Sequence, residues 1–82
     1  MNFFEKLFGK RWQMKTMGDR VKTLRKLNSM SQKEFGSIVA VSRTHIANIE
    51  ANKRMPSKPL LMLICYKFGI AEEWLRDECD TL

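Results

Sequence analysis

Apolar residues recur every three or four positions along most of the chain, which predicts helices rather than strands. No segment alternates apolar and polar residues with the period of two that a half-buried strand requires, and no segment repeats. The spacing indicates helices at residues 19–28, 32–39, 43–51, 58–68 and 72–78. The sequence therefore predicts an all-α fold, a compact bundle of about five short helices that follows an N-terminal extension.

Polar residues at the ends of these segments support the predicted helix boundaries. Asp19, Ser42 and Ser57 are suitable N-caps, and Ser31 and Glu34 have the spacing of a capping box. Gly69 follows the fourth segment, where a residue of left-handed conformation commonly ends a helix. The inward-facing apolar positions predict the core: Val21, Leu24, Leu27, Met30, Phe35, Ile38, Val39, Ile46, Ile49, Leu60, Leu61, Leu63, Ile64, Phe68, Trp74 and Leu75.

The segments 32–39 and 43–51, joined by a tight turn, have the pattern of a helix-turn-helix. Several motifs accompany them in order: Arg20-Val21-Lys22-x-Leu24-Arg25, Met30-Ser31-Gln32-x-Glu34-Phe35, Val41-Ser42-Arg43-x-x-Ile46-x-x-Ile49-Glu50, Lys53-Arg54-x-Pro56 and Ile70-x-x-x-Trp74-Leu75. With these motifs, residues 18–76 resemble the Cro/repressor-like helix-turn-helix family (the XRE family) of phage and bacterial regulators. The resemblance implies a lambda-repressor-like DNA-binding fold.

The charge distribution agrees with a polyanionic partner. The 82 residues carry a net charge of +6, but residues 1–58 hold 13 basic and 4 acidic residues, whereas residues 59–82 hold 2 basic and 5 acidic residues. A basic region on one part of a small domain favours binding of nucleic acid on that side.

Segment 43–51 is the predicted recognition helix. Its two isoleucines define the inward face, which leaves Thr44, Ala47 and Asn48 on the opposite face and Arg43 in the first turn. A recognition helix enters the major groove with its N-terminal residues leading. Arg43 suits guanine, Asn48 suits adenine and Thr44 suits thymine, while the small Ala47 lets the helix approach the base edges.

A second set of residues is expected to bind the DNA backbone rather than the bases. Gln32 begins the second predicted helix, whose free amides suit a phosphate, and the resemblance also assigns it a backbone contact. The other candidates for phosphate contact are Ser42, Lys53, Arg54 and Lys58.

The resemblance also implies an internal ion pair between Arg25 and Glu50, which would orient the recognition helix. The chain departs from the family at three tight turns, where members usually carry glycine and this sequence has Ser29, Ala40 and Asn52. Ala is costly in a left-handed conformation, by about 1–2 kcal/mol. Gly36 replaces the small residue, usually alanine, where the two helices of the motif cross, and it still permits a close approach.

We divide the chain into an extension at 1–17, the helix-turn-helix domain at 18–78 and a tail at 79–82. In the extension, Phe4 and Trp12 belong to an apolar set with helical spacing, surrounded by basic residues. It is compatible with a helix on a membrane surface, with packing on the domain or a second subunit, and with a basic arm along DNA; we favour packing or a dimer contact.

No arrangement of residues indicates an enzyme, a metal site or a cofactor. His45 is the single histidine, and with Cys65 and Cys79 it cannot supply four zinc ligands. The chain also has no secretory signal and no apolar run long enough to span a membrane, so we expect a cytoplasmic protein, with Cys65 as a buried apolar residue and Trp74 as a core anchor.

Two functions remain open at this point. The first is a transcriptional regulator, a repressor that occludes a promoter as a homodimer on an operator with two half-sites. The alternative is a protein-interaction module, such as an antitoxin, with DNA binding secondary and a protein partner held through the N-terminal segment.

Overall fold

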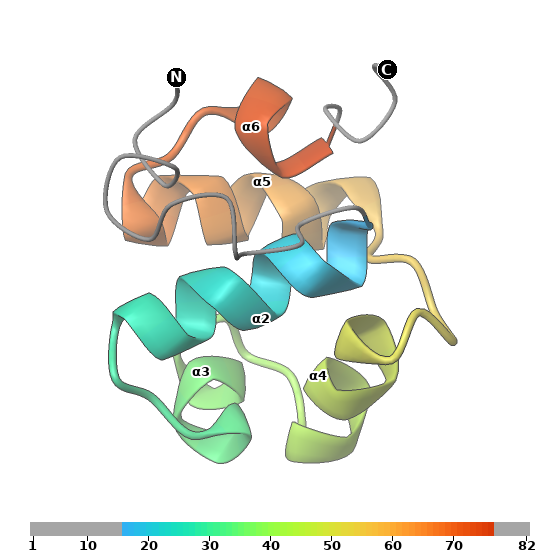
Figure 1. Ribbon diagram of the computed structural model, residues 1–82. Helices are drawn as coiled ribbons and strands as arrows, with labels where there is room; N and C mark the ends of the chain where they lie inside the picture. Colours follow the sequence, from blue (N-terminus) through green and yellow to red (C-terminus); the bar gives the residue numbers. More distant parts are fainter. Residues whose placement is uncertain (1–15, 77–82) are drawn as a thin grey trace.

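The computed structural model of the chain describes residues 16–76, and this part of the chain consists of helices without any strand (Figure 1). The helices are α2 (Met17–Leu27), α3 (Gln32–Ile38), α4 (Arg43–Glu50), α5 (Lys58–Phe68) and α6 (Glu72–Arg76). The all-α fold class is confirmed. The predictions for residues 1–15, for the tail and for the last two residues of the fifth predicted helix lie outside the described residues.

The start of α2 differs from the prediction. The N-cap is Thr16, not Asp19: the hydroxyl of Thr16 accepts the backbone N–H of Asp19 at 3.0 Å, and the Asp19 carboxylate accepts the N–H of Thr16 at 3.2 Å. Both residue types can cap a helix, and this capping box uses them together. The earlier start also buries Met17, which is 8% exposed, in the core.

The predicted caps of the next helices are present. The hydroxyls of Ser31, Ser42 and Ser57 each accept the backbone N–H three residues ahead, at the starts of α3, α4 and α5. Each cap satisfies an amide that has no partner within its own helix.

Four of the described helices, α2 to α5, end in the same type of turn. One or two positions after the last helical residue, a residue has a left-handed backbone, and the amide of the next residue donates to the carbonyl five residues back over 2.9–3.2 Å, as in a Schellman motif. The left-handed residues are Ser29, Ala40, Asn52 and Gly69, with φ of 56°, 63°, 61° and 66°. Three of these residues are not glycine, although members of the family that the sequence resembles usually carry glycine at these turns.

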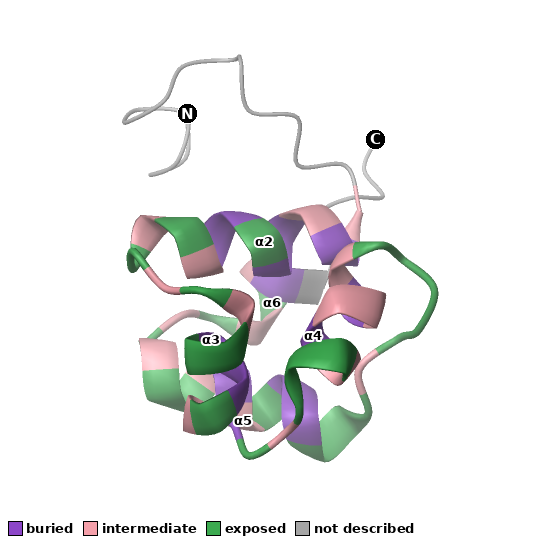
Figure 2. Ribbon diagram, turned by 90° about the horizontal axis from the view of Figure 1, so that it is seen from below, coloured by how far each residue is buried: buried purple, intermediate pink, exposed green. Residues whose placement is uncertain are grey.

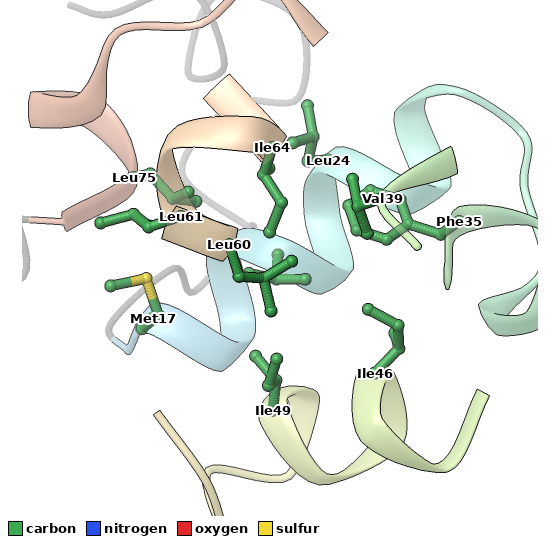
Figure 3. Packing of buried hydrophobic residues seen from close by; sticks show 11 residues of the cluster. Met17, Leu24, Phe35, Val39, Ile46, Ile49, Leu60, Leu61, Ile64 and Leu75 are labelled. Atoms are coloured by element: carbon green, nitrogen blue, oxygen red, sulfur yellow. The ribbon is translucent and has the colours of Figure 1, made fainter. Parts of the chain in front are cut away.

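Helix α2 has the pair α3 and α4 on one side and the pair α5 and α6 on the other, and the core lies between these helices (Figures 1 and 3). Phe35 of α3 stacks on Phe68 of α5, with ring centroids 4.8 Å apart. The buried apolar residues are Met17, Val21, Leu24, Phe35, Val39, Ile46, Ile49, Leu60, Leu61, Ile64 and Leu75. The remaining predicted core residues are only half-buried, and all of them except Leu27 pack against the buried cluster: Leu27, Met30, Ile38, Leu63, Phe68 and Trp74.

Trp74 connects α6 to α2. The guanidinium of Arg20, a residue that is 8% exposed, lies 5.1 Å from the centre of the Trp74 ring, and its Nη1 donates to the Trp74 carbonyl at 2.9 Å. A cation over an aromatic face is attracted by the ring quadrupole. Trp74 thus packs against the core as predicted, and Cys65 also packs there but is half-buried rather than buried.

Candidate nucleic-acid interface

The helices α3 and α4 pack closely against each other. Gly36 of α3 has no side chain, and the turn between the two helices therefore passes close to its backbone. A Cβ atom on Gly36 would lie 2.6 Å from the carbonyl oxygen of Val41 in the turn, a distance that real side chains do not adopt. The turn contains Ala40, and its left-handed conformation reverses the direction of the chain so that α4 begins three residues later. The sequence thus folds locally into a helix-turn-helix.

The outward face of α4 carries the four residues that we predicted to contact bases. Arg43 and Thr44 are exposed, and Ala47 and Asn48 are half-buried. The opposite face carries the two isoleucines, which point into the core (Figure 3). Within residues 16–76, no other side chain bonds to those of Arg43, Thr44 or Asn48. The exposed start of α4 lies beside α3 on the face seen in Figure 2.

Two of the predicted phosphate contacts lie at helix N-termini. Gln32 is the first residue of α3, and Ser42 is the N-cap of α4, where its hydroxyl accepts the backbone N–H of His45 at 3.1 Å. The N-terminus of a helix carries partial positive charge and unpaired amides, and it therefore favours an anion. His45 itself is half-buried on α4.

The other predicted phosphate contacts lie after α4. Lys53 and Arg54 are exposed in the loop that follows α4. Lys58 is placed differently: it begins α5, and its ammonium donates to Glu72 of α6 at 3.1 Å. This ion pair is exposed and weak, but it reduces the charge that Lys58 offers to DNA.

A largely buried ion pair joins the end of α4 to α2. The ion pair that the resemblance implied is present: Arg25 Nε lies 2.7 Å from Glu50 Oε2. Arg25 Nη2 also donates to Glu50 Oε1 at 3.0 Å, which makes the pair bidentate. The two side chains are 12% and 5% exposed. Arg25 Nη1 also donates to the Met30 carbonyl at 2.9 Å, which satisfies the guanidinium further.

Glu50 also bonds to a predicted phosphate contact, an interaction that the sequence did not indicate. Gln32 Nε2 donates to Glu50 Oε1 at 3.0 Å. The bond orients the Gln32 side chain at the start of α3 and ties that helix to the end of α4. The two residues are 18 positions apart on different helices, and no spacing rule for a single helix pairs them.

A contact of Asn52 with Thr16 and Gly18 was not predicted either. Asn52 Oδ1 accepts the backbone N–H of Gly18 at 3.1 Å, and Asn52 Nδ2 donates to Thr16 Oγ1 at 3.0 Å. The side chain of Asn52 thereby connects the turn after α4 to the first turn of α2. The only signal in the sequence was the asparagine at a turn position that usually holds glycine.

The charges on this side of the domain favour DNA. The Glu50 carboxylate faces Arg25 in the interior, while Arg43, Lys53 and Arg54 are exposed to solvent. Among residues 16–76, no cluster of histidine, cysteine and acidic side chains is arranged to hold a metal ion, and none of the described helices is long and apolar enough to cross a membrane.

The fold and this face define a helix-turn-helix regulator of the Cro/repressor-like class. A family model described as helix-turn-helix matches residues 21–75, and the chain belongs to this family of DNA-binding transcriptional regulators, which are not typically enzymes.

The proteins that are similar to the chain include two relatives and a solved structure. It is 37% identical over 65 residues to the uncharacterized HTH-type transcriptional regulator YgzD of Bacillus subtilis (strain 168), covering 76% of this chain and 98% of YgzD. It is 34% identical over 55 residues to the antitoxin PezA of Streptococcus pneumoniae serotype 4 (strain TIGR4), covering 67% of this chain but 35% of PezA. The chain therefore spans about a third of the length of that antitoxin.

A crystal structure of the P22 c2 repressor in complex with a synthetic operator superposes on the chain with a TM-score of 0.68. The sequence identity is 25%, and the match covers 72% of this chain and 89% of the repressor chain.

Proposed function

We propose that the protein binds double-stranded DNA in a sequence-specific manner, with α4 in the major groove, and represses transcription by occluding a promoter as a homodimer. The observation that carries the proposal is the face of α4 opposite its buried isoleucines. It presents an exposed Arg43 and a half-buried Asn48, whose side chains bond to no other side chain of the described residues.

Four residues of α4 read the bases in this proposal. Arg43, in the leading turn, donates two hydrogen bonds to guanine, and Asn48 pairs with adenine in a bidentate manner. Thr44 offers a hydroxyl and a methyl group, the latter suited to thymine. Ala47 has no long side chain, which lets the helix axis approach the base edges.

The DNA backbone is held at two places around α4. On one side, phosphate is bound by the first amides of α3, by the Gln32 side chain and by the Ser42 hydroxyl. On the other side, Lys53 and Arg54 bind phosphate from the loop. Lys58 contributes less, because it already pairs with Glu72.

A dimer is proposed because one such domain contacts only a half-site. Helix-turn-helix dimers bind half-sites separated by one turn of DNA, about 34 Å. The similarity to a repressor solved with its operator supports this arrangement. In vitro selection of bound duplexes from a random library tests it directly. We expect a site with two inverted half-sites about 10 base pairs apart, and an unsymmetrical single site would contradict the dimer.

A salt titration tests the DNA-binding proposal itself. With Lys53, Arg54 and their symmetry mates on phosphates, log K should fall linearly with log salt, with a slope steeper than about −3 per dimer. A flat salt response with the selected duplex would refute the proposed function.

A second candidate function is a protein-interaction module of the antitoxin kind. Two observations favour it: the 34% identity to PezA, and the exposed apolar residues Met62 and Tyr66, one helical turn apart on α5 and 53% and 80% exposed. The discriminating measurement is retention on duplex DNA at low salt together with the size of the protein in solution. Strong retention by a dimer supports the repressor, whereas weak retention favours the interaction module.

A further inference from the structure

Asn52 has a side chain that its turn does not require. The residue follows α4 with a φ of 61°, its N–H donates to Ile49 O at 3.0 Å, and the next N–H, of Lys53, donates to Asn48 O at 2.9 Å. These backbone bonds complete a Schellman motif, for which glycine is the commonest residue. A glycine would form the same turn with less conformational strain.

The amide group of Asn52 makes two bonds to the start of α2, a region 34 and 36 positions away in the chain. Its oxygen accepts the N–H of Gly18, which lies in the first turn of α2 and so has no partner within the helix. Its nitrogen donates to the hydroxyl of Thr16, which caps the same helix. Both halves of the Asn52 amide group are therefore bonded to one helical turn.

The two helix ends meet closely at this point. A Cβ atom on Gly18 would lie 2.5 Å from the carbonyl oxygen of Ile49 and 2.7 Å from that of Glu50, so the backbone of α2 rests directly on the last carbonyls of α4. The positive N-terminal end of α2 thus faces the negative C-terminal end of α4, an attractive arrangement. The contact fixes the turn after α4 in position against α2.

The residues directly after Asn52 are Lys53 and Arg54, both exposed and not bonded to any other side chain of the described residues. Their side chains do not hold the loop, so its position depends on the backbone bonds of the turn and on the side-chain bonds of Asn52. We propose, building on the proposed function, that Asn52 is a positioning residue for the DNA backbone. Its bonds to Thr16 and Gly18 hold Lys53 and Arg54 where they meet phosphates while α4 lies in the groove.

The test compares two glycine substitutions at left-handed positions. Asn52→Gly keeps the turn and removes both side-chain bonds. Ser29→Gly is the matched control, because Ser29 has a φ of 56° and its side chain bonds to none of the described residues. Each variant is titrated with a random-sequence duplex of about 30 base pairs, which covers the two half-sites of a dimer, at several salt concentrations and far below its melting temperature.

We expect Ser29→Gly to bind like the parent protein. Asn52→Gly should bind about five-fold more weakly, a decrease equivalent to one intramolecular hydrogen bond. Its salt slope should be shallower by up to about one unit for each phosphate that the loop no longer binds. A merely structural role at the turn would change the melting temperature but not the salt slope of the folded protein.

Substitutions at Thr16 supply an independent test of the same contact. Thr16→Ser retains the hydroxyl and should bind like the parent. Thr16→Val removes the bond from Asn52 Nδ2 and the cap of α2 but retains the bond of Gly18 to Asn52, so it should lose part of the affinity that Asn52→Gly loses. The double variant should lose little more than Asn52→Gly alone, because that substitution already removes the contact with Thr16. Additive losses would contradict the coupling.

The results separate this inference from the proposed function. Parental binding and salt slope in folded Asn52→Gly would overturn the role of Asn52 while leaving the DNA-binding proposal intact. If the parent protein itself shows no salt-dependent binding to duplex DNA, the proposed function fails, and the role of Asn52 fails with it.

Discussion

The two ends of α4 differ in how they are held. At the leading end, the side chains of Arg43 and Thr44 are exposed and bond to no other side chain of the described residues. At the trailing end, Glu50 bonds to Arg25 and Gln32, and Asn52 bonds to the start of α2. The fixed end orients the helix, which leaves the leading end free to contact DNA.

This division has a physical reason. A side chain that is to read a base must keep its donors available, and it loses rotamer freedom only when it binds. A helix that carries such side chains must itself be held rigidly, because small errors in position weaken directional hydrogen bonds. The bonded side chains of Glu50 and Asn52 at the trailing end meet the second requirement without interfering with the first.

The largest effect is expected from breaking the trailing end at Glu50. Glu50→Ala leaves the guanidinium of Arg25 largely buried with an incomplete set of partners, and breaking such a pair costs about 3–5 kcal/mol of stability. Thermal unfolding should show a much lower Tm, and binding to every duplex should weaken. The control is Lys58→Ala, which removes an exposed ion pair and should cost less than about 1 kcal/mol. Equal losses in the two variants would show that burial of the Glu50 pair is unimportant.

The leading end is tested by Arg43→Ala. We expect a loss of about 1–3 kcal/mol on the selected duplex, with nearly unchanged binding to random DNA, because the proposed function places Arg43 against a base edge. Lys53→Ala is the contrasting variant: it should weaken both duplexes alike and reduce the salt slope by about one unit. Titrations of both variants against both duplexes check this. If each variant weakens the two duplexes in the same proportion, α4 does not read the sequence.

The contact between α2 and α4 is tested by Gly18→Ala. The added methyl group meets backbone oxygens at 2.5 and 2.7 Å, which the helices relieve only by moving apart. Alanine favours a helix by up to about 1 kcal/mol over glycine, but overpacking costs about 1–3 kcal/mol. We expect a net loss of stability, measured by denaturant unfolding. Lys22→Ala, an exposed substitution on the same helix, should change stability by less than about 0.5 kcal/mol. A Gly18→Ala protein as stable as the parent would contradict the close contact.

The smallest effect is expected just before the leading end, at Ala40. Ala40→Gly retains a φ near 63° and relieves the strain of a left-handed alanine. We expect a gain of about 1 kcal/mol, equivalent to about 4–8 °C in Tm for a domain of this size, with no change in the affinity for DNA. A lower Tm would show that the turn is not strained by the alanine.

The sequence by itself determined the helices and the face of α4 that is available to DNA. Helical periodicity placed two isoleucines inward and Arg43, Thr44, Ala47 and Asn48 outward, because side chains on one helix keep fixed angles to one another. Serine caps and left-handed turns are local as well, and they were predicted correctly at most positions. At α2 the prediction of Asp19 as the N-cap placed the start of the helix too late, because Thr16 is the cap and Asp19 completes its capping box.

Only the tertiary structure decided what holds the trailing end of α4. The bonds of Asn52 to Gly18 and of Gln32 to Glu50 join residues 34 and 18 positions apart. Such pairs depend on how separate helices pack, and no periodicity within one helix encodes that packing. The Arg25–Glu50 pair, 25 positions apart, was expected only because the whole set of motifs resembled a known family. Helix–helix contacts between distant segments are set by the packed core, and that is why the residues that orient α4 became visible only in three dimensions.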